Sequence, residues 1–397
     1  MKFSPLCVWG NQVRPSIKVW IGFSAAFVAA SLAVLFWQFI NLEPGLDMPW
    51  MPARLLGQGI DPYGAYLEPT SNNPQFLAQI PNMLHTTYVM FAPLGFMSWE
   101  WAKSIYSIIN VVLAGVILVR VRSIFKLSNM EFSLVATLFV VSTPFRVTIY
   151  NGQFSLVALL GVTLFLERAT ITRAIGLGIG LLKYSFAFPI AFLILLTKDI
   201  RNLLGLVLLP ALFGMVVFHT IFQARSDYAI VSMVIAPLRV ALVGTGLGAS
   251  DLYSLFRSVV PEASNVTLLG ILIAISIFGL LAAIRLRELD KWSQIALICL
   301  VTLTILPHLI YDYVFLLPVV AYAVVLRKTR LKWFIAPTVA WHWFLFGPFQ
   351  TLSVLVKIPE TISIVLGLAM NVLAVTGLML MAKRDSATEH ETSDHCN

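Results

Sequence analysis

Charged residues are scarce in this chain. Lys, Arg, Asp and Glu make up 12% of its 397 residues, whereas ordinary soluble domains carry about 25%. Hydrophobic residues make up 59%, and the mean hydropathy is +0.87. These values exclude a soluble globular enzyme, a disordered chain and a nucleic-acid-binding domain. They predict an all-helical membrane protein, with room for about a dozen spans of roughly 20 residues each.

Cysteine is also scarce, and nucleotide-binding motifs are missing. Cys7, Cys299 and Cys396 lie far apart without CxxC or Cys/His spacing, so the sequence predicts neither a zinc site nor a disulfide framework. The chain has no GxxxxGK[ST] loop, no DxD pair and no Ser/His/Asp nucleophile signature. The sequence therefore gives no indication of a nucleotide substrate.

Long apolar runs follow one another along most of the chain. The run 18–41 is too long for a cleavable signal and is interpreted as a retained anchor. Two stretches are ambiguous: 80–98 carries two prolines, and 173–197 is interrupted by Lys183. The other runs lie near 101–120, 131–149, 152–168, 202–222, 265–284, 293–308, 312–326, 333–350 and 359–382.

Basic residues cluster between these runs and indicate an orientation. If the clusters are cytoplasmic, 80–98 must lie along or dip into the outer face. The stretch 173–197 must then be two short helices that meet near Lys183 at that face. We expect about twelve spans in one domain, 1–384, with both termini cytoplasmic. Two long outer loops, 42–100 and 224–264, face the other side, and a polar tail, 385–397, is expected to be disordered.

The first outer loop holds a carboxylate next to the membrane. Asp47 follows the first span, where it could accept a proton from a substrate hydroxyl, or act only as a helix cap or a solubilising loop residue. Residues 50–57 can form one or two turns of an interfacial helix that Gly59 stops. Asp61-Pro62-Tyr63 is typical of a turn.

Two further motifs carry polar residues on the same face. Asn151-Gly152-Gln153 suits a tight turn between helices, and Gln153 could equally offer its amide to a sugar or phosphate. Lys183 lies in an apolar stretch. A lysine at that depth indicates an anionic partner in a cavity, unless its side chain extends to the interface.

A late motif follows Pro307. His308 could donate to a phosphate oxygen and Asp312 could orient a neighbouring group; the alternative is an interfacial His308/Tyr311 belt with a helix cap at Asp312. Further residues could contact an anion, although each also suits an ordinary surface position: His85, Arg225, Arg239 and Arg257.

These motifs together resemble glycosyltransferase family 87, the polyprenyl-phosphate-dependent mannosyltransferases of the GT-C superfamily. The first loop resembles that family's pattern of Asp, an aromatic three residues on, Ala, Leu-Leu, Gly and Asp-Pro-Tyr. Gly152-Gln153, the glycine-rich stretch 176–180 before Lys183, and His308 with Tyr311-Asp312 resemble its later motifs. The chain departs from the family where Trp50 replaces a tyrosine, where no proline follows Lys183, and before Phe91.

The resemblance implies inverting transfer of a sugar, mannose or another hexose or pentose, from a polyprenyl-phosphate donor. The acceptor would be a glycolipid, polysaccharide or protein outside a bacterial inner membrane. Asp47 would be the general base, and Lys183, His308 and Arg257 would bind the donor phosphate. Because a monophosphate lipid can leave with protein cations alone, we expect no metal and no cofactor. The substrate-binding residues would be Trp50, Arg54, Asp61, Tyr63, His85, Asn151, Gln153, Tyr311 and Asp312.

Two alternatives stay open at this point. A lipid-linked-sugar transporter or flippase would use the same lysine and histidine along a translocation path. A GT-C ligase or polymerase would take a diphosphate-linked oligosaccharide and would need more arginines, which Arg225, Arg239 and Arg257 could provide.

Overall fold

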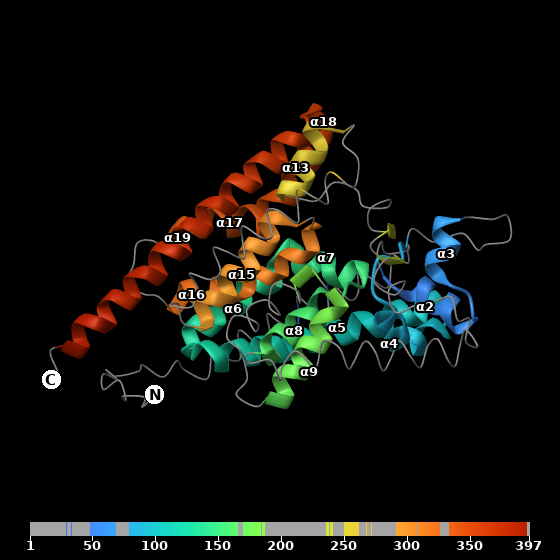
Figure 1. Cartoon of the computed structure of the whole chain (residues 1–397), viewed down its shortest axis with the longest axis horizontal. Helices are drawn as coiled ribbons and strands as arrows, with labels where there is room; N and C mark the ends of the chain where they lie inside the picture. The colour runs from blue at the N-terminus through green and yellow to red at the C-terminus, as the bar shows by residue number, and fades with distance from the viewer. Residues whose placement is uncertain are drawn as a thin grey trace.

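In the computed structural model, every regular element among the described residues is a helix (Figure 1). The described residues are 48–68, 79–165, 170–183, 185–186, 250–261, 291–306, 308–325 and 333–394, together with positions 29, 33, 236, 237, 239, 240, 267 and 271. The apolar run 202–222, almost all of 18–41 and 265–284, and the residues Asp47 and Arg225 lie outside them.

Three described segments are long and apolar enough to cross a membrane. They are α5 (Trp99–Phe125), Ala336–Val356, and Glu360–Leu380 at the start of α19 (Glu360–Asp394). A fourth is possible if α6 (Asn129–Val141) and α7 (Thr143–Asn151), which meet at a 53° bend, form one broken span. The prediction of a helical membrane protein is confirmed.

Helix α5 shows why such a segment suits lipid. Ile108, Val112 and Val119 are among its exposed apolar residues, whereas Ala114 and Val121 are fully buried against the rest of the protein. A helix that is apolar on both sides can face lipid with one side and protein with the other.

The C-terminal tail corrects one expectation. Residues 385–397 were expected to be disordered, but α19 continues as a helix through Asp394. Its 35 residues span about 52 Å at 1.5 Å per residue, whereas a bilayer core is about 30 Å thick. Because extending an existing helix costs far less than nucleating one, a polar segment directly after a span can continue the helix. Figure 1 shows α19 running beyond the other helices.

Residues 48–68 and 79–98, which belong to the predicted first outer loop, fold into a small helical unit, the first-loop lobe. It contains α2 (Trp50–Gly57), α3 (Pro62–Leu67) and α4 (His85–Gly95). The expected helix at 50–57 is confirmed, and Gly59 follows it with a positive φ of 74°. Within 80–98 the helix has 11 residues and is not among the candidate spans. Figure 1 shows α2, α3 and α4 together at one side of the helical bundle.

Glycines fix two close helix contacts. At Gly95 an added Cβ would lie 2.8 Å from the backbone nitrogen of Arg54, so α4 packs directly on α2. At Gly161, in α8 (Ser155–Phe165), it would lie 2.6 Å from the carbonyl oxygen of Gly176 in α9 (Thr170–Gly180). The second contact holds α9, and the 3-10 turn η1 (Leu181–Lys183) that follows it, against α8.

Helix α13 (Leu252–Val259) precedes α15 (Lys291–Ile305), which is followed by the 3-10 segment η5 (Ile310–Leu316) and by α16 (Leu317–Val325). Among the remaining described elements, η5 packs against α8, whereas α13, α16 and α19 pack against α15. The segment Ala336–Val356 consists of α17 (Ala336–Ala340), a π-helical turn, η7 (Trp341–Leu345), and α18 (Phe346–Val356). The apolar run 312–326 therefore begins as a 3-10 segment.

Candidate functional site

The turn between α7 and α8 lies between the first-loop lobe and the bundle. Helix α7 ends at Asn151, and Gly152 adopts a positive φ of 63°, so the expected Asn-Gly turn is confirmed. An added Cβ on Gly152 would lie 3.0 Å from the sulfur of Met48. Met48 directly follows Asp47, so the chain next to the proposed base reaches this turn, although Asp47 itself lies outside the described residues. Gln153 is buried, and its carbonyl accepts a hydrogen bond from Tyr106 at 3.4 Å.

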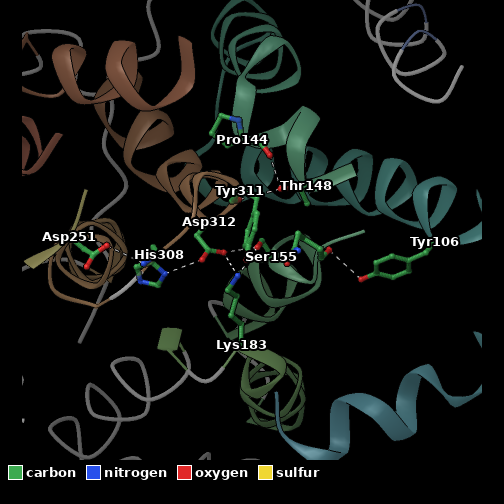
Figure 2. Close-up of polar contacts among 10 residues, drawn as sticks. Tyr106, Pro144, Thr148, Ser155, Lys183, Asp251, His308, Tyr311 and Asp312 are labelled. Atoms are coloured by element: carbon green, nitrogen blue, oxygen red, sulfur yellow. Dashed lines mark hydrogen bonds and ion pairs between the residues drawn. The ribbon is translucent and has the colours of Figure 1, made fainter. Parts of the chain in front are cut away.

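A buried ionic cluster lies at the start of α8. The Lys183 ammonium forms an ion pair with Oδ1 of Asp312 and donates to the Ser155 hydroxyl at 3.0 Å. Ser155 in turn donates to Asp312 Oδ1 at 2.8 Å. Figure 2 shows these side chains converging from η1, η5 and α8. Asp312 is 129 residues from Lys183 and 157 from Ser155, so only the fold brings them together.

His308 completes the cluster. Its Nδ1 lies 3.1 Å from Asp312 Oδ2 (Figure 2), and an ionised carboxylate can only accept, so Nδ1 donates. The other ring nitrogen, Nε2, is buried and has no hydrogen-bond partner among the described residues. Asp312 therefore contacts both Lys183 and His308, as expected of a residue that orients its neighbours. It lies inside η5 and not at a helix cap.

Asp251 is a site residue that the sequence did not reveal. Its carboxylate caps α13 by accepting from the Ser254 backbone at 2.8 Å, and it also accepts from the His308 backbone nitrogen at 3.3 Å. Burial raises the pKa of Asp251 to about 6, although the bonds from Ser254 and the nearby His308 lower it. Aspartate three residues before serine is a visible capping pattern, but its burial beside His308 depends on segments distant in sequence.

Lys183 has an anionic partner within the protein. The anion that Lys183 contacts in this structure is Asp312, so its positive charge is already compensated within the protein. The Lys183 ammonium also lies 4.6 Å from the ring centre of Tyr311, whose carbonyl accepts from Thr148 at 3.3 Å. Arg257, also expected at the donor phosphate, lies in the last turn of α13, six residues after Asp251.

The predicted substrate residues of the first loop lie together in the first-loop lobe. Trp50 donates from Nε1 to the Met97 carbonyl at 3.2 Å, and the Arg54 guanidinium lies 5.3 Å from its ring centre. The rings of Tyr63 and His85 are 4.5 Å apart, and Tyr63 donates to the Met83 carbonyl. These contacts stabilise the lobe, so most of these side chains serve its packing.

Two ionisable groups in the lobe are perturbed by burial. Burial lowers the pKa of His85 to about 4, so the ring is neutral at pH 7. Burial raises the pKa of Asp61, although hydrogen bonds from the backbone of Tyr63 and Gly64 lower it. Asp61 accepts from the Tyr63 nitrogen at 3.1 Å and caps α3, so the expected turn is a helix start.

Metal ligation finds no support in the described part of the chain, where no group of three or more His, Cys, Asp or Glu residues is arranged to hold an ion. Comparison with known proteins adds no further indication: neither a scan against protein-family models nor a search of curated proteins found a match for this chain.

Proposed function

We propose that the protein is a GT-C glycosyltransferase that moves a sugar from a polyprenyl-phosphate donor to an acceptor hydroxyl outside the cytoplasm. One observation carries the proposal. The first loop, the Gly152-Gln153 turn, Lys183 and the His308–Asp312 segment are far apart in sequence, yet they form one continuous region. Met48 packs on Gly152, and Ser155, three residues later, contacts the ionic cluster.

The proposed chemistry is a single displacement at the sugar. The acceptor oxygen forms a bond to the anomeric carbon, the bond from that carbon to the phosphate oxygen breaks, and Asp47 takes the hydroxyl proton. The leaving polyprenyl phosphate keeps the electron pair, and Lys183 and His308 stabilise the growing charge. Asp312 and Asp251 hold these two groups in position through the contacts described above.

The wider assignment belongs to the same proposal. It includes a GT-C arrangement of about twelve spans, a bacterial inner membrane, and a site on the periplasmic face with both chain ends in the cytoplasm. A phosphate monoester with a lysine ammonium and a histidine N–H beside it can leave without a metal, so the proposed reaction uses none.

Asp47→Asn tests the proposal. We expect it to abolish sugar transfer while the purified protein still binds the donor, because an amide cannot take the acceptor proton. The assay incubates wild type and variant with a panel of polyprenyl-phosphate sugars and candidate acceptors and analyses the products by mass. Glu100→Gln makes the same change at an exposed carboxylate in the first turn of α5, and should retain transfer. Near-normal turnover by Asp47→Asn would refute the base.

A transporter or flippase is the second candidate. The observation that favours it is the buried Lys183–Asp312–His308 cluster, since paired ionisable groups among membrane helices often line ion or proton pathways. Proteoliposomes with a lipid-linked sugar labelled in the sugar distinguish the two. Transfer separates the label from the lipid, whereas transport moves the intact lipid to the other leaflet.

A further inference from the structure

Three polar side chains in the first-loop lobe have hydrogen-bonding atoms without partners. The atoms are Nε2 of Gln79, Oδ1 of Asn82 and Oγ1 of Thr87, and each is shielded from solvent. None has a hydrogen-bond partner in the part of the chain that the structure describes. Gln79 and Thr87 are both 0% exposed. Buried polar groups nearly always have a hydrogen-bond partner. Three unpaired atoms within nine residues therefore indicate that a polar ligand binds here.

The backbone around these residues is held firmly. Tyr63 donates to the Met83 carbonyl, and the Met83 nitrogen donates to the Tyr88 hydroxyl at 2.9 Å. The other end of the Gln79 amide, Oε1, accepts from the Met51 nitrogen at 2.8 Å. These bonds hold the segment that carries the unpaired atoms in its closed arrangement.

The three atoms can form hydrogen bonds with hydroxyl groups. A glutamine amide nitrogen donates, an asparagine carbonyl oxygen accepts, and a threonine hydroxyl does both. The same segment carries aromatic rings that pack on Tyr63: the ring centre of Tyr63 is 4.5 Å from that of His85 and 5.8 Å from that of Tyr88. Amides and hydroxyls next to aromatic rings fit the hydroxyl edges and the apolar faces of a sugar.

The charge of the lobe argues against a phosphate at this place. His85 is neutral at pH 7 because burial lowers its pKa to about 4. Arg54 packs against Gly95 at the last turn of α4, whereas Thr87 is in the first turn, eight residues or about 12 Å along the helix. The ionic cluster, by contrast, lies on the bundle side of the Gly152 turn.

We propose that Gln79, Asn82 and Thr87 form a binding subsite for a neutral sugar, the sugar moiety of the acceptor. The choice of acceptor rests on the proposed function, whereas the subsite itself does not. The lobe must open for a sugar to reach these shielded atoms. The donor sugar would bind near Lys183 and His308, and the acceptor sugar would bind on the other side of the Gly152 turn.

Thr87→Val tests the subsite, because it removes the unpaired hydroxyl and keeps the shape of the side chain. Full-length protein in nanodiscs is titrated with a panel of methyl hexosides and pentosides, and binding is followed by saturation-transfer NMR. We expect the Kd of the bound glycoside to rise roughly 3- to 10-fold, the range of one neutral hydrogen bond. The melting temperature should stay unchanged or rise, since the free protein loses no hydrogen bond.

Thr338→Val is the matched control. Thr338 is equally buried, but its hydroxyl donates to the Met370 carbonyl at 2.5 Å, far along the chain from the lobe. This variant should lower the melting temperature and leave glycoside binding unchanged. Gln79→Glu provides a second probe, because it keeps the acceptor used by Met51 and removes the unpaired amide donor. It should also weaken glycoside binding.

The outcomes separate the subsite from the transferase. If the wild type binds no glycoside in the panel, or if Thr87→Val and Gln79→Glu bind as well as the wild type, the subsite is wrong. If both variants weaken glycoside binding while no sugar is transferred from any polyprenyl-phosphate donor, the proposed subsite is supported and the proposed transferase function is refuted. A loss of affinity for polyprenyl-phosphate sugar alone, with glycosides unaffected, would assign the atoms to the donor and overturn the acceptor assignment.

Discussion

Removing one partner of the Lys183–Asp312 ion pair should strongly destabilise the protein. The two side chains are buried, with 8% of Lys183 and 3% of Asp312 exposed. In Lys183→Met, the carboxylate loses the ammonium that pairs with it and keeps the Ser155 hydroxyl and the His308 ring. An uncompensated buried charge of this kind costs about 3–5 kcal/mol. This is a factor of roughly 10² to 10³·⁵ in the folding equilibrium constant.

The double variant Lys183→Met/Asp312→Leu isolates the pair. It removes both charges and fills the space with apolar groups, and buried pairs replaced in this way are often neutral or more stable. We expect it to be more stable than Lys183→Met, with an interaction energy of at least about 1 kcal/mol in a double-mutant cycle. Unfolding is followed in a single detergent for the wild type, both single variants and the double variant. Additive effects of the two substitutions, or an unchanged Lys183→Met, would refute the ion-pair reasoning.

Two further predictions concern packing and pH. Gly161→Ala should destabilise the protein by about 1–3 kcal/mol, because the added Cβ would lie 2.6 Å from the Gly176 carbonyl oxygen. The control is Gly115→Ala in α5, where an added Cβ meets nothing within 4 Å. In thermal unfolding this control should be neutral or stabilising. The folded-state pKa of His85, about 4, lies below its ordinary value of 6.5, so its contribution to stability is present above pH 6.5 and lost as the pH falls toward 4. From pH 7 to pH 5 the loss is about 2 kcal/mol. Asp251, whose pKa is raised, acts in the opposite direction, so the measured quantity is the difference in pH dependence between the wild type and His85→Phe. Equal pH dependence of the two would contradict the burial of a neutral His85.

The ionic cluster also bears on the choice between the two candidate functions. Compensation of Lys183 by Asp312 means that a donor phosphate has to compete with a carboxylate already in place. In a transferase, Asp312 would keep the lysine ordered between turnovers. In a transporter, the same competition would couple substrate binding to the charge state of the cluster. The geometry of the cluster fits both functions, so the labelled-sugar experiment is what distinguishes a transferase from a transporter.

Several features follow from the sequence because their causes are local. Composition and long apolar runs determine a helical membrane protein, since a backbone in lipid must satisfy its own hydrogen bonds. The Asn-Gly turn before Gln153 and the helix at 50–57 were also predictable, because glycine stops or reverses a helix through positive φ angles that other residues avoid. Lys183 was conspicuous because a charge in an apolar stretch needs a partner.

The partners of those residues were decided only by the tertiary structure. The sequence indicates that Lys183 needs an anion, but Asp312 and Ser155 are 129 and 28 residues away, and nothing local selects them over a ligand phosphate. From the sequence, Asp251 is an ordinary helix cap, and only the folded chain shows that it is buried against His308. Local patterns fix where a helix begins, turns and ends, whereas burial and charge pairing depend on which segments pack together, and only the folded chain determines that.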